Sequence, residues 1–173
     1  MKASGIYDFH VHIGETIGGH LLADSWKSFN LLYEHNGLEG IGAFVTESPN
    51  EPLSSKLARM RKASLSFSGK VFWHLTPRQL DMRKLERILK EDTDLKLYTT
   101  YREAGLYQSY ESIERFMEEM PTPQKRLLVH CEEDEIISEY SERYPFHKPS
   151  DHCLRRPEKA EIAAVEKLLN LSI

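Results

Sequence analysis

Cysteine is scarce in this sequence, since only Cys131 and Cys153 occur among 173 residues. These two cysteines form no CxxC motif, and they indicate neither a disulfide framework nor a thiol-based metal site. No apolar stretch approaches the roughly 20 residues that a membrane-spanning helix needs, and the N-terminal stretch MKASGIYDFH has no hydrophobic signal-peptide region. We therefore expect a cytoplasmic protein with no membrane partner.

Runs of basic residues are missing as well. The chain has 23 Lys and Arg residues against 27 Asp and Glu residues, which gives a formal net charge of −4. This balance gives no reason to expect nucleic acid or an anionic membrane as a partner. The composition, 40% hydrophobic and 29% charged, is typical of one folded domain. Because no repeat or low-complexity segment interrupts the chain, we expect a single domain over residues 1–173.

Segments with strand and helix patterns alternate along the chain. The predicted strands are 5–13, 41–47, 69–77, 94–101 and 126–132. The predicted helices are 24–37, 53–67, 82–91, 109–120, 134–144 and 157–171. Strands separated by helices of this length indicate right-handed βαβ units and a parallel sheet. We expect an α/β fold built as a TIM-barrel-like domain with about five strands, incomplete because a full barrel takes about 250 residues.

Two histidines lie two residues apart in the stretch YDFHVHIG, residues 7–14. Side chains alternate across a strand, so we expect His10 and His12 to share one face with Asp8. The apolar residues between them are expected on the opposite face, covered by helices: Tyr7, Phe9, Val11 and Ile13. Two imidazoles at the C-terminal rim of a barrel can converge on zinc or a similar metal. The alternative is a half-exposed strand with incidental histidines.

The ends of later strands carry further candidates. Lys96 lies between two leucines in the fourth predicted strand, where a charged ammonium is costly unless it is paired or neutralised. It is either a lysine extending from an edge strand to water or one that CO2 converts to an anionic carbamate. His130 is a ligand or a core histidine, and Asn50 is a site residue or part of a turn. With His10 and His12, these residues all fall near the C-terminal ends of different strands.

Other polar residues were weighed and given structural roles. We expect His74, in the third strand, to be a core residue rather than a ligand. The spacing of His147, His152 and Cys153 matches no standard zinc pattern. The acidic run at 132–135 is interpreted as a solvated cap, since a helix dipole favours negative charge at the N-terminus.

Five motifs follow one another in an order that resembles dihydroorotases and related cyclic amidohydrolases of the amidohydrolase superfamily. They are DFHVHIGE, ESPNEP, DLKLYTTYREAGLY, LLVHCEED and RRPEKAEIAAVEKLL. The resemblance covers nearly the whole chain but only the first five βα units of the family's barrel. It implies a metal-dependent hydrolase fold.

The resemblance also implies the ligands and the reaction. His10 and His12 would bind the more buried of two zinc ions, Lys96 as a carbamate would bridge both, and His130 would bind the second; manganese or cobalt could substitute. Asn50 would contact the carboxylate side of the substrate. The implied reaction is hydrolysis or formation of a cyclic amide C–N bond, such as that linking dihydroorotate and N-carbamoyl-aspartate. The expected small-molecule partner is therefore a cyclic amide or an N-carbamoyl amino acid.

The sequence departs from the family pattern in two ways. Gly14 stands where dihydroorotases usually have a substrate-binding arginine, and the sequence ends at Ile173, before the family's sixth-strand histidine and eighth-strand aspartate base. No catalytic base is assigned, and we expect little dihydroorotase activity from the chain alone. One alternative is a non-catalytic, amidohydrolase-derived subunit. Another is a different HxH metal hydrolase, such as a phosphoesterase. We also expect a homo-oligomer or a partner that completes the barrel.

Overall fold

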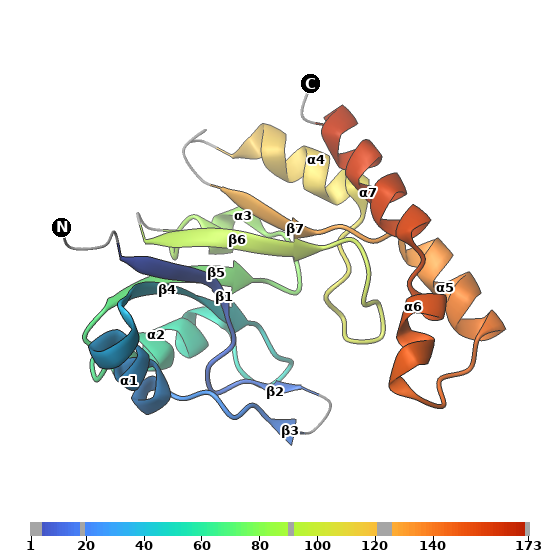
Figure 1. The fold of residues 1–173 in the computed structure, drawn as a ribbon. Helices are drawn as coiled ribbons and strands as arrows, with labels where there is room; N and C mark the ends of the chain where they lie inside the picture. The colour runs from blue at the N-terminus through green and yellow to red at the C-terminus, as the bar shows by residue number, and fades with distance from the viewer. Residues whose placement is uncertain (1–4, 18–19, 90–91, 121–125, 172–173) are drawn as a thin grey trace. The chain divides into compact units, whose positions relative to one another are not determined.

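Parallel strands joined by helices make up the fold, as the alternating pattern predicts. The structure, a computed structural model, describes residues 5–17, 20–89, 92–120 and 126–171. Its main sheet contains β1 (Ile6–Val11), β4 (Leu38–Thr46), β5 (Lys70–Thr76), β6 (Thr93–Tyr98) and β7 (Leu127–His130). The strands lie in that same order across the sheet, as consecutive βα units require (Figure 1). The predicted α/β class with five parallel strands is confirmed.

The chain divides into two compact units. The first contains Met1–Pro77 and Glu86–Leu95, and the second contains Arg78–Leu85 and Lys96–Ile173. The boundary falls within β6, so that Leu95 belongs to the first unit and Lys96 to the second. Each unit is described by itself below.

The first unit contains helices α1 (Trp26–Asn36) and α2 (Leu53–Ser64), which both pack on β4 (Figure 1). Helix α1 begins at Ser25, whose hydroxyl accepts the backbone N–H of Ser28, and ends at Gly37 with a φ of 74°. The sequence indicates Asp24 or Ser25 as the N-cap and Gly37 as the end of this helix, and the structure uses Ser25. Serine satisfies a free N–H, and glycine adopts the left-handed conformation without strain. The predicted bounds of this helix hold within two residues.

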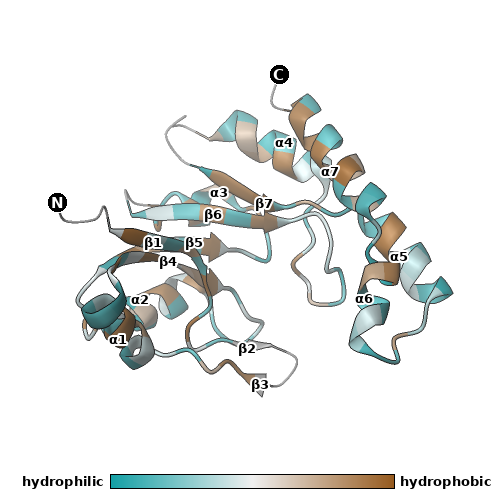
Figure 2. Cartoon of the chain, viewed as in Figure 1, coloured by the Kyte–Doolittle hydropathy of each residue, from teal (hydrophilic) through white to brown (hydrophobic). Residues whose placement is uncertain are grey.

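Apolar residues of β4 form the core of the first unit. Ile41, Ala43 and Val45 are fully buried, and α2 contributes Leu57 and Met60 to the buried set. Figure 2 shows a mixture of hydrophobic and hydrophilic colours on α1 and α2. That distribution is expected for parallel strands covered by amphipathic helices.

The second unit contains α3 (Met82–Leu85), α4 (Tyr110–Glu119), α5 (Asp134–Arg143) and α7 (Glu158–Leu171). Its core includes Ile113 and Phe116 of α4 and two fully buried alanines of α7, Ala160 and Ala164. Alanine lets α7 approach closely, and the backbone of Glu133 donates a hydrogen bond to the carbonyl of Ala160 at 2.9 Å. This contact ties α7 to the start of α5.

Several short elements differ from the sequence prediction. Helix α3 has four residues, although the pattern predicts a helix over 82–91. The pattern did not predict the antiparallel pair β2 (Thr16–Ile17) and β3 (His20–Leu21), the 3-10 turn η1 (Pro149–Asp151) or α6 (His152–Arg155). Elements of two to four residues are too short to show a periodicity. Among the described residues, no helix is long and apolar enough to cross a membrane.

The face assignment of β1 is partly wrong. Between Asp8 and Val11, β1 advances three residues while its partner advances two, from Ile41 to Ala43. The extra residue disturbs the alternation, as in a β-bulge. Tyr7 and Phe9 therefore contact the ring of Phe72 instead of lying under helices. The prediction holds for Val11 and Ile13, which are buried.

Candidate metal site

His10 and His12 lie together at the end of β1. Their ring centroids are 5.5 Å apart, and both rings pack against Phe44 of β4 at 4.6 and 4.5 Å. The phenyl ring is almost completely buried, so it forms a fixed wall behind the two imidazoles. The structure thus brings the predicted histidine pair together on one face, within the first unit.

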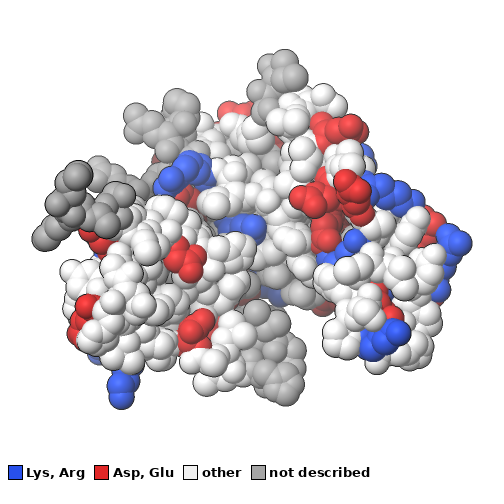
Figure 3. All heavy atoms as spheres, in the orientation of Figure 1, with Lys and Arg blue, Asp and Glu red and all other residues white. Residues whose placement is uncertain are grey.

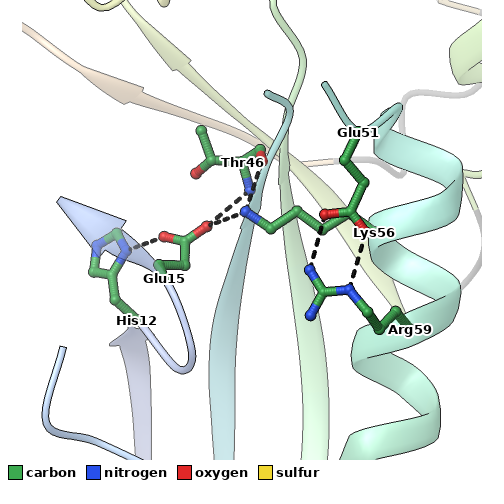
Figure 4. A network of polar contacts seen from close by, with 6 residues as sticks. All are labelled: His12, Glu15, Thr46, Glu51, Lys56 and Arg59. Atoms are coloured by element: carbon green, nitrogen blue, oxygen red, sulfur yellow. Dashed lines mark hydrogen bonds and ion pairs between the residues drawn. The ribbon is translucent and has the colours of Figure 1, made fainter. Parts of the chain in front are cut away.

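Glu15 fixes the orientation of His12. Its side chain is 5% exposed, and one carboxylate oxygen lies 2.8 Å from Nδ1 of His12 (Figure 4). The other oxygen accepts the backbone N–H of Thr46 at 3.0 Å and the Nζ of Lys56 at 3.2 Å. Lys56 also donates to the carbonyl of Thr46 at 2.9 Å. The network therefore joins the ends of β1 and β4 to helix α2.

The charge state of Glu15 decides the tautomer of His12. Burial by itself raises the pKa of this carboxyl, but the His12 hydrogen bond, the Lys56 charge and the Thr46 N–H together lower it to about 2. An ionised carboxylate can only accept, so Nδ1 of His12 must carry the hydrogen. In the neutral imidazole the lone pair is then on Nε2, which is the state a metal ligand requires.

The other candidates of the first unit have simpler surroundings. Asn50 lies in an exposed turn between Ser48 and Glu51, whose backbones pair with each other. Glu51 in turn forms a two-point ion pair with Arg59 of α2, at 2.9 and 2.8 Å. The substrate role of Asn50 stays a prediction. Asp8 accepts the backbone N–H of His10 at 3.0 Å.

His74 has the environment of a core residue. It is 2% exposed, and its Nε2 donates to the carbonyl of Phe9 at 3.0 Å. This hydrogen bond joins β5 to β1 across the intervening β4, where Gly42 leaves the space.

Lys96 is buried in the second unit, on β6. It is 7% exposed, and its Nζ lies 5.4 Å from the ring centroid of Tyr98. Burial lowers the pKa of this ammonium, while the neighbouring Cys131 raises it. A lowered pKa increases the fraction of neutral amine, which is the form that reacts with CO2. The position is thus not a lysine extending to water from an edge strand.

His130 ends β7 in the same unit and shares Tyr98 as a neighbour, at a centroid distance of 5.7 Å. Its Nε2 lies 2.7 Å from a carboxylate oxygen of Glu132, which also pairs with Arg156. Burial raises the pKa of Glu132, and the His130 hydrogen bond and the Arg156 charge outweigh it, so that the net shift is downward. Because Nε2 of His130 donates to Glu132, Nδ1 is the nitrogen that can coordinate a metal.

The structure therefore groups the predicted ligands as two pairs, His10 with His12 and Lys96 with His130. Within the described residues, no group of three or more His, Cys, Asp or Glu side chains is placed to hold a metal ion. The pattern analysis missed Glu15 and its partner Lys56, although a glutamate three residues after His12 was the available signal. It also misjudged the acidic run, because Glu132 and Glu133 are mostly buried and paired rather than solvated.

Known proteins resemble this chain in structure more than in sequence. No protein-family model matches the sequence, and no curated protein does. A D-hydantoinase structure matches with a TM-score of 0.84 and 20% identity over 97% of this chain and 38% of its own. The D-hydantoinase of Bacillus sp. AR9 matches with a TM-score of 0.84 and 20% identity, over 97% of this chain and 39% of its own. Dihydropyrimidinase from Brevibacillus agri NCHU1002 matches with a TM-score of 0.81 and 20% identity, over 97% of this chain and 38% of its own.

The chain folds as part of a TIM-barrel-like domain. It spans about 38% of the length of the enzymes that it matches. The predicted TIM-barrel-like class with an incomplete barrel is confirmed, and the structures named above are D-hydantoinases and a dihydropyrimidinase. At this level of identity the likeness establishes the fold alone.

Proposed function

We propose that this chain carries metal ligands of a zinc-dependent hydrolase that acts on cyclic amide C–N bonds. The observation that carries the proposal is the His10 and His12 pair with its buried Glu15, on a fold shared with hydantoinases. The residues fit a metal, because Glu15 holds the hydrogen of His12 on Nδ1 and leaves Nε2 as the donor. Bound zinc would supply an activated water and would polarise the amide carbonyl.

The residues of the chain have separate parts in this proposal. His10 and His12 hold one metal, with Glu15 orienting His12. Lys96 as a carbamate and His130 are the other proposed metal ligands, and manganese or cobalt could replace zinc. Asn50 contacts the substrate from its exposed turn. Phe44 behind the imidazoles excludes water from that side of the histidine pair.

The substrate we propose is a small cyclic amide, opened to an N-carbamoyl amino acid. Dihydroorotate follows from the sequence motifs, whereas the names of the structural neighbours point to hydantoins and dihydropyrimidines. Gly14 in place of an arginine favours the latter two, because they lack the carboxylate that an arginine would bind.

A non-catalytic partner subunit is the second candidate. It is favoured by apolar side chains that stand exposed on α7, namely Ile162 at 49% and Val165 at 37%. Such a surface is typical of a face that a second chain covers.

The test measures zinc content after reconstitution of the metal-free chain, in wild type and in the variants His10→Ala and His12→Ala. We expect the wild type to retain zinc and each variant to retain clearly less. His35→Ala is the matched control, because the His35 imidazole is 70% exposed on α1. The zinc content of this variant should equal that of the wild type. Equal zinc in all four proteins would contradict the proposal.

A second arm assigns the substrate. Ring opening of hydantoin, dihydrouracil and dihydroorotate is followed in the zinc-loaded chain and in both variants. If the wild type opens one of these rings and neither variant does, the result supports the proposed hydrolase function. Retained zinc without opening of any ring favours the partner subunit instead.

A further inference from the structure

A pocket of about 340 Å³ lies in the second unit, beside the proposed metal ligand His130, whose ring centroid is 5.3 Å from that of Tyr101. It is lined by Tyr101, Ser141, Phe146, His152, Arg155 and Arg156. We call it the Arg155 pocket. Its volume is within the range of small-molecule sites, and all six lining residues belong to the same unit.

The lining offers hydrogen-bond donors and no carboxylate. Two guanidinium groups, an imidazole and two hydroxyls face the pocket, and no Asp or Glu lines it. Two acidic residues beside the lining are already engaged. Glu132 pairs with Arg156 and His130, and Asp151 accepts the backbone N–H groups of His147 and Lys148 at 2.9 and 3.0 Å.

Arg155 lacks the partner that a buried guanidinium nitrogen requires. Its Nε is buried, and among the described residues no hydrogen-bond acceptor reaches it. The guanidinium lies 5.7 Å from the ring of Phe146, a contact that does not satisfy an N–H. An orphaned donor of this kind costs about 1–3 kcal/mol, which favours a turn of the Arg155 side chain that brings this N–H to an acceptor supplied by a ligand.

The walls of the pocket are fixed before any ligand binds. Asp151 is buried and holds the loop between Phe146 and His152. The N–H of Arg156 donates to the carbonyl of His152 at 3.0 Å, which closes the turn of α6. Tyr101 holds a strained backbone with a φ of 67°, and its ring lies 4.9 Å from the guanidinium carbon of Arg156.

We propose that the Arg155 pocket binds a small oxyanion, a carboxylate or phosphate group, through the guanidinium of Arg155. A planar guanidinium donates two parallel hydrogen bonds to such a group. The hydroxyls of Ser141 and Tyr101 add neutral donors, while Phe146 provides an apolar wall for the organic part of a ligand. Two guanidinium groups exclude a cation. Although Tyr101 and Arg156 adjoin His130 and Glu132, binding of an oxyanion here does not depend on the proposed hydrolase function.

The test titrates the full, metal-free chain with sodium acetate and, separately, with inorganic phosphate at constant ionic strength. Binding is measured by calorimetry and by the Nε–H signals of ¹⁵N-labelled arginine. We expect saturable binding of at least one anion with a shift of the Arg155 signal, assigned through its absence in Arg155→Lys. Tighter binding of acetate identifies a carboxylate site, and tighter binding of phosphate identifies a phosphate site.

Variants separate a built site from general charge attraction. Arg155→Gln is expected to weaken binding about tenfold or more, and Arg155→Lys to weaken it less because the charge remains. Arg115→Gln, on an exposed position of α4, removes the same charge and should bind like the wild type. Equal weakening by Arg115→Gln, or no saturable binding of either anion, would overturn the proposal. If Arg155→Gln does not fold, the Nε–H titration of the wild type and Arg155→Lys decides.

Discussion

The buried carboxylate of Glu15 connects three separate segments of the first unit. It contacts the His12 ring, the Thr46 backbone and the Lys56 ammonium within 3.2 Å (Figure 4). The lowered pKa of Glu15 means that folding favours its ionised form. One residue thus stabilises the fold and sets the tautomer of a proposed metal ligand.

We predict that Glu15→Gln destabilises the metal-free chain at neutral pH by about 3 kcal/mol, since a shift of the pKa from 4.5 to about 2 corresponds to that free energy. The Glu15 contribution is present above pH 4.5 and is lost as the pH falls toward 2. Urea unfolding at several pH values checks this. A difference between the two proteins that stays constant from pH 7 to pH 3 would contradict it.

Lys96 provides a second prediction at the residue scale. Native mass spectrometry with bicarbonate and zinc should show a carbamate adduct, because burial lowers the pKa of this amine. Lys96→Arg should abolish the adduct, since a guanidinium stays charged and forms no comparable carbamate. Lys70→Arg is the control, as Lys70 is exposed at the start of β5. An adduct that persists in Lys96→Arg would place the modification elsewhere.

Among the elements, β1, β4 and β5 approach one another through Gly42. A Cβ at this position would lie 2.3 Å from Nε2 of His74 and 2.9 Å from the backbone of Phe9. The hydrogen bond from His74 to Phe9 passes through the space that glycine leaves. The close packing behind the two proposed ligand histidines therefore depends on a missing side chain.

We predict that Gly42→Ala lowers the free energy of unfolding by about 1–3 kcal/mol, the usual cost of overpacking. Adding His74→Ala removes the clash with the imidazole but not that with the Phe9 backbone. The double variant should therefore be no more stable than His74→Ala alone. Urea unfolding measures all three proteins, and an unchanged midpoint in Gly42→Ala would argue against this close approach.

At the scale of the whole molecule, we propose that the surface favours association. On the face shown in Figure 3, acidic and basic groups are interspersed in small clusters among uncharged surface. The net charge of −4 gives little repulsion between copies. The exposed apolar residues of α7, Ile162 and Val165, are one helical turn apart and share a face.

We predict that the chain self-associates through this face of α7. Light scattering should give a mass above 20.1 kDa that rises with concentration. The pair Ile162→Lys and Val165→Lys should return it to the monomer, because two ammonium groups oppose burial of the face. Glu34→Lys, at a 57% exposed position of α1, changes the net charge by the same +2, one charge removed and one added, and should leave the association intact. A monomeric wild type would refute the prediction.

The pattern of the sequence predicted the strand order and most helices. Period-2 apolar strands alternating with capped amphipathic helices leave few arrangements other than consecutive parallel βα units. Ser25 and Gly37 marked the ends of α1 for local reasons, because capping depends on nearby backbone groups. Local chemistry also placed His10 and His12 side by side, since two residues along a strand share a face.

Only the tertiary structure decided the rest. The register shift in β1 depends on pairing with β4, and it moved Tyr7 and Phe9 to the side of Phe72. Glu15 became a strongly acidic, buried carboxylate because Lys56, 41 residues away, reaches it from α2. The Arg155 pocket likewise depends on Tyr101 meeting residues of α5 and α6. Interactions of this kind depend on which segments the core brings together, and the free energy that places them comes from packing rather than from local sequence.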